Sequence, residues 1–161
     1  LTKNTEDYQQ AFNLLFHNTV VLTELAVPGM IRHHFGRIIN VASSSVKEPI
    51  PQLVLSNTMR TAMVSYMKTL SRKVAAEGIT VNTVLTGLFD TGRLKALIQG
   101  NAAKQQISYE EAHRNLLETL PMKRAGNPEE YGYLVAFLAS GYSAYLTGTT
   151  LPLDGGNSDY L

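Results

Sequence analysis

RIINVASSS, at residues 37–45, reads as a buried strand that runs into a serine-rich loop. A long helix is predicted over residues 54–76, and ITVNTVL at 79–85 reads as a second buried strand that ends at Thr86 and Gly87. Strand, loop, helix and strand in this order form a βαβ unit, whose right-handed crossover leaves the two strands parallel. Both strands are nearly continuous in apolar or β-branched residues, which is typical of strands with helices on both faces of their sheet. The sequence therefore predicts an α/β fold.

The βαβ unit also indicates where a ligand would bind. In open parallel sheets, ligands bind beyond the carboxyl ends of the strands. Ser43 follows the first strand and Gly87 follows the second. We therefore expect the serine loop and the Thr86-Gly87 turn to lie side by side at the site.

Length and composition limit the classes of protein that the chain can represent. At 161 residues and 44% hydrophobic, the sequence fits one globular domain. Its net charge of +1, with no run of Lys or Arg, gives no electrostatic reason to expect nucleic acid. The absence of cysteine excludes disulfides and thiolate chemistry. The longest apolar stretch, residues 19–31, contains Glu24 and Pro28 and is too short to span a bilayer, so we expect a cytoplasmic protein that binds no membrane.

A first helix is predicted from about Thr5. Its apolar residues cover more than one stripe, which implies burial against its own sheet and against a second subunit. Pro28 predicts a kink deep in this helix. Three histidines, His17, His33 and His34, read better as polar positions on the helix and its exit loop than as metal ligands, because no acidic partner lies at ligand spacing beside them.

Two amphipathic pieces, at residues 93–99 and 108–120, follow the second strand. Ser108 and Glu111 have the spacing of a capping box at the start of the second piece. The polar run between the pieces, residues 100–106, favours either a mobile lid or a solvated loop.

A last helix and a last strand are predicted near the end of the chain. Asn127 followed by Pro128 and Glu130 is a strong helix start, because it combines a capping residue, a proline at the first helical position and an acid three residues past the cap. Residues 149–153 read as a strand, and Pro152 confines that strand to a sheet edge.

Short motifs occur in order along the chain: GRIINVAS at 36–43, GITVN at 78–82, NPEE at 127–130, LTG at 146–148 and DGG at 154–156. Together they resemble the C-terminal two-thirds of a short-chain dehydrogenase/reductase, most of all the 3-oxoacyl-[acyl-carrier-protein] reductases. The resemblance implies that residues 1–161 are a single domain, the C-terminal part of a Rossmann-type doubly wound parallel sheet. In that sheet the chain would supply the last three strands and their flanking helices.

The same resemblance places the family's phosphate-binding glycine loop upstream of this sequence. None of the 12 glycines here forms a Gly-x-Gly-x-x-Gly pattern. Three strands with an uncovered edge are also a poor free-standing fold. We therefore expect that the N-terminal dinucleotide-binding part is absent from this chain, and that an upstream half or a partner completes it.

In this family a serine at the end of a strand polarises the substrate carbonyl. A tyrosine 13 residues later delivers the proton, and a lysine four residues further lowers the tyrosine pKa. The resemblance puts Ser43, Ser56 and Arg60 at these three positions and makes them the candidate catalytic residues. Ser56 is a weaker acid than a phenol, whose pKa is about 10, and Arg60 keeps the positive charge but stays protonated. The family's supporting asparagine falls at Leu15, with Asn18 one turn away.

Each of these residues has a plainer alternative. Ser43 can be a strand-end hydroxyl that caps the loop, Ser56 can be part of a helix start, and Arg60 can be a solvated arginine. Ser43 as a hydrolase nucleophile is disfavoured, because no Gly-x-Ser-x-Gly elbow surrounds it.

The resemblance implies NAD or NADP as cofactor, bound by Arg60, Thr86, Gly87, Phe89 and Thr91. Thr86-Gly87 stands where the family usually has Pro-Gly. Thr91 matches the threonine that contacts the nicotinamide carboxamide. Cofactor preference in this fold is set near the end of the second strand of the complete sheet, which lies outside this sequence.

Two functions therefore stay open. The first is an NAD(P)-dependent oxidoreductase that transfers hydride between nicotinamide and a small-molecule carbonyl or alcohol, and the retained Ser43 and Thr91 favour it. The second is a catalytically silent family member that binds a ligand or serves as an assembly subunit, and the replaced tyrosine and lysine favour it. Family precedent also implies a homodimer or homotetramer through the two long helices.

Overall fold

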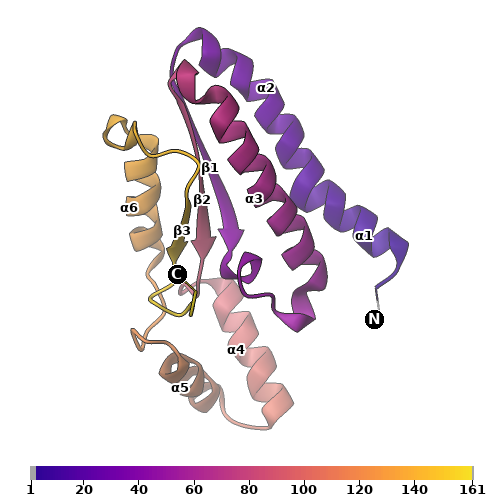
Figure 1. Ribbon diagram of the computed structural model, residues 1–161. Helices are drawn as coiled ribbons and strands as arrows, with labels where there is room; N and C mark the ends of the chain where they lie inside the picture. Colours follow the sequence, from indigo (N-terminus) through magenta and orange to yellow (C-terminus); the bar gives the residue numbers. More distant parts are fainter. Residues whose placement is uncertain (1–2, 161) are drawn as a thin grey trace.

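The computed structural model describes residues 3–160. Its centre is a sheet of three parallel strands, β1 (Gly36–Ser43), β2 (Ile79–Thr86) and β3 (Thr150–Leu153), in the order β1-β2-β3. Figure 1 shows the three arrows pointing the same way. The predicted α/β fold with three parallel strands is confirmed.

Helices cover both faces of this sheet (Figure 1). One face carries α3 (Val54–Val74) and a long N-terminal helix composed of α1 (Thr5–Phe12), the π-helical turn η1 (Asn13–His17) and α2 (Asn18–Arg32). The other face carries α6 (Pro128–Ala139), while α4 (Gly92–Gln105) and α5 (Tyr109–Thr119) lie beyond the carboxyl ends of the strands. Short 3-10 turns complete the chain: η2 (Ser44–Val46), η3 (Pro51–Leu53), η4 (Ala75–Glu77) and η5 (Gly141–Ser143).

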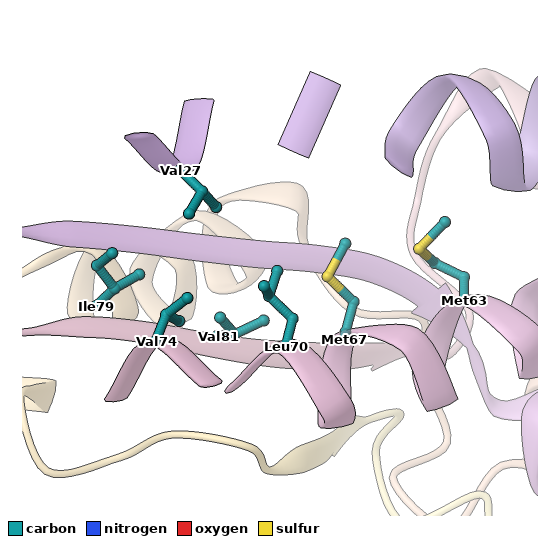
Figure 2. Close-up of a cluster of buried hydrophobic side chains, with 7 residues drawn as sticks. All are labelled: Val27, Met63, Met67, Leu70, Val74, Ile79 and Val81. Atoms are coloured by element: carbon teal, nitrogen blue, oxygen red, sulfur yellow. The ribbon is translucent and has the colours of Figure 1, made fainter. Parts of the chain in front are cut away.

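The main core lies between α2, α3 and the sheet. Figure 2 shows its buried side chains: Val27, Met63, Met67, Leu70, Val74, Ile79 and Val81. The four from α3 recur every three or four residues, so they share one helix face. Met63 and Met67 are therefore core residues. β2 is buried over its first seven residues, and each aliphatic side chain buried there contributes about 1.5–3 kcal/mol.

The predicted helix boundaries are largely confirmed. α3 begins at Val54, and the chain leaves the following 3-10 turn at Gly78 in the left-handed conformation, with φ of 74°. Asn127 caps α6 in a capping box with Glu130. β3 lies at the edge of the three-stranded sheet and tolerates Pro152 there, since it pairs only with β2 among the described strands.

Pro28, where a kink is predicted, does not end the N-terminal helix, and a separate irregularity lies earlier in that helix. Pro28 lies inside α2, and the helix continues to Arg32. The departure from α-helical geometry is the π turn over Asn13–His17, about three turns earlier. The N-terminal helix is therefore continuous from Thr5 to Arg32.

The N-terminal helix has one packed side and one exposed apolar side. Thr23 and Val27 are buried toward the core, whereas Leu14, Leu22 and Leu25 are 70%, 68% and 74% exposed. Residues 3–160 therefore supply only one of the two burial surfaces expected for this helix. The 28-residue helix is also long and apolar enough to cross a membrane by length and composition, which the stretch 19–31 alone was not.

The prediction of a lid or loop over residues 100–106 is wrong. α4 runs through Gly100 to Gln105 and ends at Gln106, which has a positive φ of 56°. The helix persists because Ile98 and Ala102 are both buried against α5. Ser108 accepts a hydrogen bond from the Glu111 N–H at the start of α5, as its spacing predicted.

Candidate active site

The serine loop and the Thr86-Gly87 turn lie side by side. Ser43 is the last residue of β1, and it pairs in register with Thr86, the last residue of β2. The Gly87 N–H then donates to the Leu153 carbonyl at 3.0 Å. A Cβ on Gly87 would lie 2.5 Å from the Asp154 Cα, so only glycine fits this close approach. The expected meeting of these two segments is confirmed.

Ser43 caps the loop and still keeps its own proton. Its backbone is extended, and its Oγ accepts a 3.2 Å hydrogen bond from the Ser45 N–H at the start of η2. A serine hydroxyl can accept and donate at the same time. The capping role proposed as an alternative is therefore real, and it leaves the Ser43 O–H available to a substrate oxygen.

Ser56 and Arg60 form a pair one turn apart on α3. The Arg60 Nε–H donates to Ser56 Oγ at 3.1 Å, and Arg60 Nη1 donates to the Val41 carbonyl at 3.1 Å. Arg60 is therefore fixed between its helix and β1, and the reading of a simply solvated arginine is wrong. The bond from the guanidinium occupies a lone pair of Ser56 and leaves the Ser56 proton free.

The Arg60 guanidinium borders a cavity of about 100 Å³ between the N-terminal helix and β1. A guanidinium has five N–H donors, and the two bonds described above use two of them. The remaining donors are available for hydroxyl or phosphate oxygens. The cavity is lined by Leu14, Leu15, Thr19, Asn40, Val41, Ala42, Arg60 and Met63.

At the end of β2 the polar side chain of Thr86 is hydrogen-bonded within the protein. Thr86 Oγ1 and Tyr131 Oη lie 3.0 Å apart in a hydrogen bond that joins β2 to α6. Burial raises the pKa of Tyr131, and the bond to Thr86 partly offsets that rise. The Phe89 ring meets Tyr131 edge-on, with centroids 5.2 Å apart, and also fills the space where Gly126 has no side chain. Tyr131 was not identified from the sequence as a partner of Thr86, although a threonine at the end of a buried strand signals a polar partner.

Thr91 is the N-cap of α4. Its Oγ1 accepts from the Leu94 N–H at 3.4 Å and donates to the Phe89 carbonyl at 3.3 Å. Both bonds are longer than the usual 2.7–3.2 Å. A ligand amide can therefore compete for this hydroxyl at low cost.

A second cavity, of about 110 Å³, lies beyond the ends of β2 and β3. At its rim Arg124 donates to both carboxylate oxygens of Glu130 at 2.7 Å. The hydrogen bonds from Arg124, with one from the Asn127 N–H, lower the pKa of Glu130 from its ordinary 4.5 to about 2. The cavity is lined by Leu88, Phe89, Met122, Arg124, Gly126, Glu130, Leu153, Asp154 and Gly155.

Metal ligation finds no support in residues 3–160. No group of three or more His, Asp or Glu side chains gathers there in a way that could hold an ion. His34 instead lies 3.8 Å from the Glu77 carboxylate.

Comparison with known proteins places the chain among oxidoreductases. A family model described as enoyl-(acyl carrier protein) reductase matches residues 1–158. This chain belongs to the short-chain dehydrogenase/reductase family.

Individual members of the short-chain dehydrogenase/reductase family agree with that assignment. The chain is 35% identical over 128 residues to the NADPH-dependent reductase BacG of Bacillus subtilis, covering 80% of this chain and 49% of BacG. It is 35% identical over 137 residues to the 3-oxoacyl-[acyl-carrier-protein] reductase FabG of Vibrio cholerae, covering 84% of this chain and 51% of FabG. The chain thus spans about half the length of these relatives.

The fold agrees equally well with a solved structure of the family. YwfH, an NADPH-dependent reductase involved in bacilysin biosynthesis, superposes with a TM-score of 0.93 at 31% identity, over 99% of this chain and 61% of YwfH. The Rossmann-type part-sheet expected from the motifs is therefore confirmed.

The cavity beside Arg60 is consistent with the nicotinamide end of a family cofactor. Leu15, at the position where the family has an asparagine, lines the same cavity as Arg60, at the position of the family lysine. Arg60 brings unused N–H donors to this cavity. These donors suit a ribose, whereas the described residues offer no glycine-rich turn for a pyrophosphate.

Proposed function

We propose that this chain forms the substrate side of an NAD(P)-dependent oxidoreductase that transfers hydride between nicotinamide and a small-molecule carbonyl or alcohol. The observation that carries the proposal is the Ser43 hydroxyl, whose oxygen is already bonded at the end of β1 while its proton stays free. The match to the short-chain dehydrogenase/reductase family supports the same class of reaction. The 3-oxoacyl reductases among the relatives favour a 3-oxoacyl-like substrate.

In this proposal two serine hydroxyls donate hydrogen bonds to the carbonyl oxygen of the substrate. Ser43 and Ser56 each accept a hydrogen bond from the protein, which leaves each O–H free to donate to a substrate. Two donors aimed at an oxygen that gains negative charge stabilise the transition state more than the ground state. The nicotinamide, when bound, supplies the hydride.

The proton must reach the alkoxide by a different route from the family's tyrosine. An aliphatic hydroxyl is too weak an acid to ionise as a phenol does. Ser56, polarised by Arg60, instead gives its proton to the alkoxide while it takes one from a water molecule, and the hydroxide left behind is neutralised by the solvent buffer. General acid catalysis contributes about 10²- to 10⁴-fold, so turnover slower than in members with the tyrosine is expected.

The cofactor contacts of the proposal come from both strand ends. Arg60 would hold the ribose through its spare N–H groups, and the backbone of Thr86 and Gly87 would lie beneath the nicotinamide. Phe89 and Thr91 would close the side toward α4, where the Thr91 hydroxyl would bond to the carboxamide. Either NAD or NADP is compatible with this set.

The assembly and location of the protein are also proposed. The exposed apolar face of the N-terminal helix, with Leu22 and Leu25, supports pairing of α2 and α3 with a second copy in a homodimer or homotetramer. The net charge of +1 without a basic run supports a protein that binds no nucleic acid. We propose a cytoplasmic protein, with the apolar helix in a subunit interface and not in a membrane.

A turnover assay tests the proposed reaction. The full-length protein that carries this chain is mixed with NADPH or NADH and a panel of ketones and 3-oxoacyl thioesters, and oxidation is followed at 340 nm. We expect Ser43→Ala to lower kcat/KM about 10²-fold, the usual loss for one oxyanion donor. Ser65→Ala, at an exposed position of α3, is the matched control and should leave turnover unchanged. Equal rates for wild type and Ser43→Ala would rule out the role given to Ser43.

The replacement of tyrosine and lysine favours a second candidate, a silent member that binds a ligand or serves as an assembly subunit. In that case NADPH binds to the full-length protein, as followed by its fluorescence, and no ketone in the panel is reduced. Turnover of any panel member in wild type excludes the silent alternative.

A further inference from the structure

The residues after β3 cross the carboxyl edge of the whole sheet. We call residues 154–160 the strap. It begins at Asp154, whose backbone touches Gly87 at the end of β2. Five residues later the Asp159 N–H donates to Glu48 Oε1 at 2.9 Å, and Glu48 lies in the loop that follows β1. Because the strands lie in the order β1-β2-β3, the strap passes over the strand ends where Ser43 and Thr86 meet.

The strap brings a phenol onto the serine loop. Lys47, four residues after Ser43, holds its Nζ 5.8 Å from the centre of the Tyr160 ring, within the range of a cation–aromatic contact. Figure 1 shows the yellow C-terminal segment beside the carboxyl ends of the strands. The loop that follows Ser43 therefore contacts a tyrosine, which does not stand at the position where the family has one.

Unsatisfied polar atoms concentrate around this loop. Within residues 3–160, the buried side-chain polar atoms without a hydrogen-bond partner are Ser45 Oγ, Asn57 Oδ1 and Tyr160 Oη. Ser45 lies in the loop, the Asn57 Nδ2 donates to the Ile50 carbonyl of the loop, and Tyr160 lies over Lys47. Buried polar groups are almost always paired, so three exceptions against one loop point to a ligand that completes their bonding.

We propose that Tyr160 is a specificity-determining residue that selects carbonyl substrates carrying a hydroxyl or similar hydrogen-bonding group a few bonds from the carbonyl. The inference rests on the proposed reductase function and specifies its substrate class. The strap is tied to the loop by the Asp159 N–H bond and the Lys47 contact, both of which are weak enough to open for an entering substrate. When the strap closes again, the Tyr160 hydroxyl gains the partner that it lacks. A substrate with a methyl group in that place leaves the phenol unpaired.

A matched pair of ketones tests this selection in the full-length protein. 4-Hydroxy-2-butanone and 2-pentanone differ only in a hydroxyl in place of a methyl group. Tyr160→Phe removes the phenol oxygen and keeps the ring over Lys47. Tyr145→Phe removes a fully exposed phenol oxygen and is the control. kcat/KM is measured for both ketones with NADPH and with NADH.

We expect Tyr160→Phe to lower kcat/KM for 4-hydroxy-2-butanone about 5- to 30-fold, as for the loss of one buried hydrogen bond. The value for 2-pentanone should stay within about twofold, and Tyr145→Phe should change neither value. A loss that is equal for the two ketones, or no loss for either, overturns the proposal.

Hydrogen exchange separates this inference from the proposed reaction. If wild type reduces neither ketone, the proposed reaction fails for this pair, and the role of Tyr160 is decided by exchange at the Asp159 amide. Slower exchange with 4-hydroxy-2-butanone in wild type, absent from Tyr160→Phe, supports the role. The same response in both proteins, or no response in wild type, overturns it.

Discussion

The carboxyl ends of β1 and β2 carry similar residue types and use them differently. At β1 the hydroxyls of Ser43 and Ser56 accept hydrogen bonds from the protein and keep their protons, and Arg60 keeps N–H donors beside a cavity. At β2 the Thr86 hydroxyl is paired with Tyr131, and β2 is buried over its first seven residues. The end of β1 thus carries groups that are free to react, whereas the groups at the end of β2 support the fold.

This division indicates where chemistry and stability should separate. Groups with unused donors beside a cavity can bind a substrate without first breaking internal bonds. Groups that are paired inside the fold hold the turn in place and cost free energy of unfolding when removed. Substitutions at β1 should therefore change turnover more than stability, and substitutions at β2 should do the reverse.

The largest expected effect is on stability at β2. Leu85 is fully buried, so Leu85→Ala should lower the free energy of unfolding by about 2–5 kcal/mol. Leu97→Ala, at a position of α4 that is 42% exposed, is the control and should cost about 0.5 kcal/mol or less. Urea unfolding of the full-length protein measures both. Similar costs at the two positions would contradict the supporting role of β2.

Arg60 should affect turnover much more than stability. Arg60→Met removes the proposed charge-assisted hydrogen bonds to the cofactor ribose, worth about 1.5–3 kcal/mol, which corresponds to a loss of roughly 10- to 100-fold in kcat/KM. Arg60→Lys should recover part of that loss, because it keeps the charge but not the planar fork. Arg72→Met, at an exposed position on the same helix, is the control. A drop in melting temperature that accounts for the lost activity would show that Arg60 is structural.

Tyr131 should show the opposite behaviour. Tyr131→Phe leaves Thr86 without its partner and should cost about 1 kcal/mol of unfolding free energy. Turnover should change less than twofold, since Thr86 acts through its backbone in the proposed site. Tyr133→Phe, with an exposed side chain on the same helix, serves as the reference. A large loss of turnover without a loss of stability would show that the Thr86 side chain takes part in the reaction.

The smallest effect concerns pH at the rim of the second cavity. The pKa of Glu130 is lowered from 4.5 to about 2 in the fold, so its bond to Arg124 stabilises the protein above pH 4.5. That contribution should fall as the pH drops from 4.5 toward 2. Melting temperatures of wild type and Glu130→Gln should therefore converge between pH 6 and pH 2. A constant difference across this range would show that the charge of Glu130 does not matter.

The sequence predicted the fold well where hydrophobic runs and caps agree. The strand at 79–85 is continuous in apolar or β-branched residues except at Asn82, and it is flanked by Gly78 and Gly87, so the sequence located it well. Asn127 with Pro128 and Glu130 marked the start of α6 to the residue. The polar run at 100–106 misled, because polar residues on the outer side of a helix look the same as a loop until the buried Ala102 is seen.

The candidate site was only partly predictable. The adjacency of Ser43 and Thr86 follows from strand order, which the sequence implied. The bonds of Arg60 to Ser56 and to the Val41 carbonyl depend on side-chain rotamers, which no spacing rule supplies. The contact of Tyr160 with the serine loop joins residues more than 100 positions apart, and no local pattern indicates it.

A crystal structure of the full-length protein with NADP⁺ tests the central claim most directly. The account predicts the nicotinamide ring against Gly87 and Thr86, with Ser43 Oγ facing the open side of the ring and Arg60 bonded to the ribose. A cofactor bound away from the carboxyl ends of β1 and β2, or one that leaves Ser43 and Arg60 without contact, would contradict it.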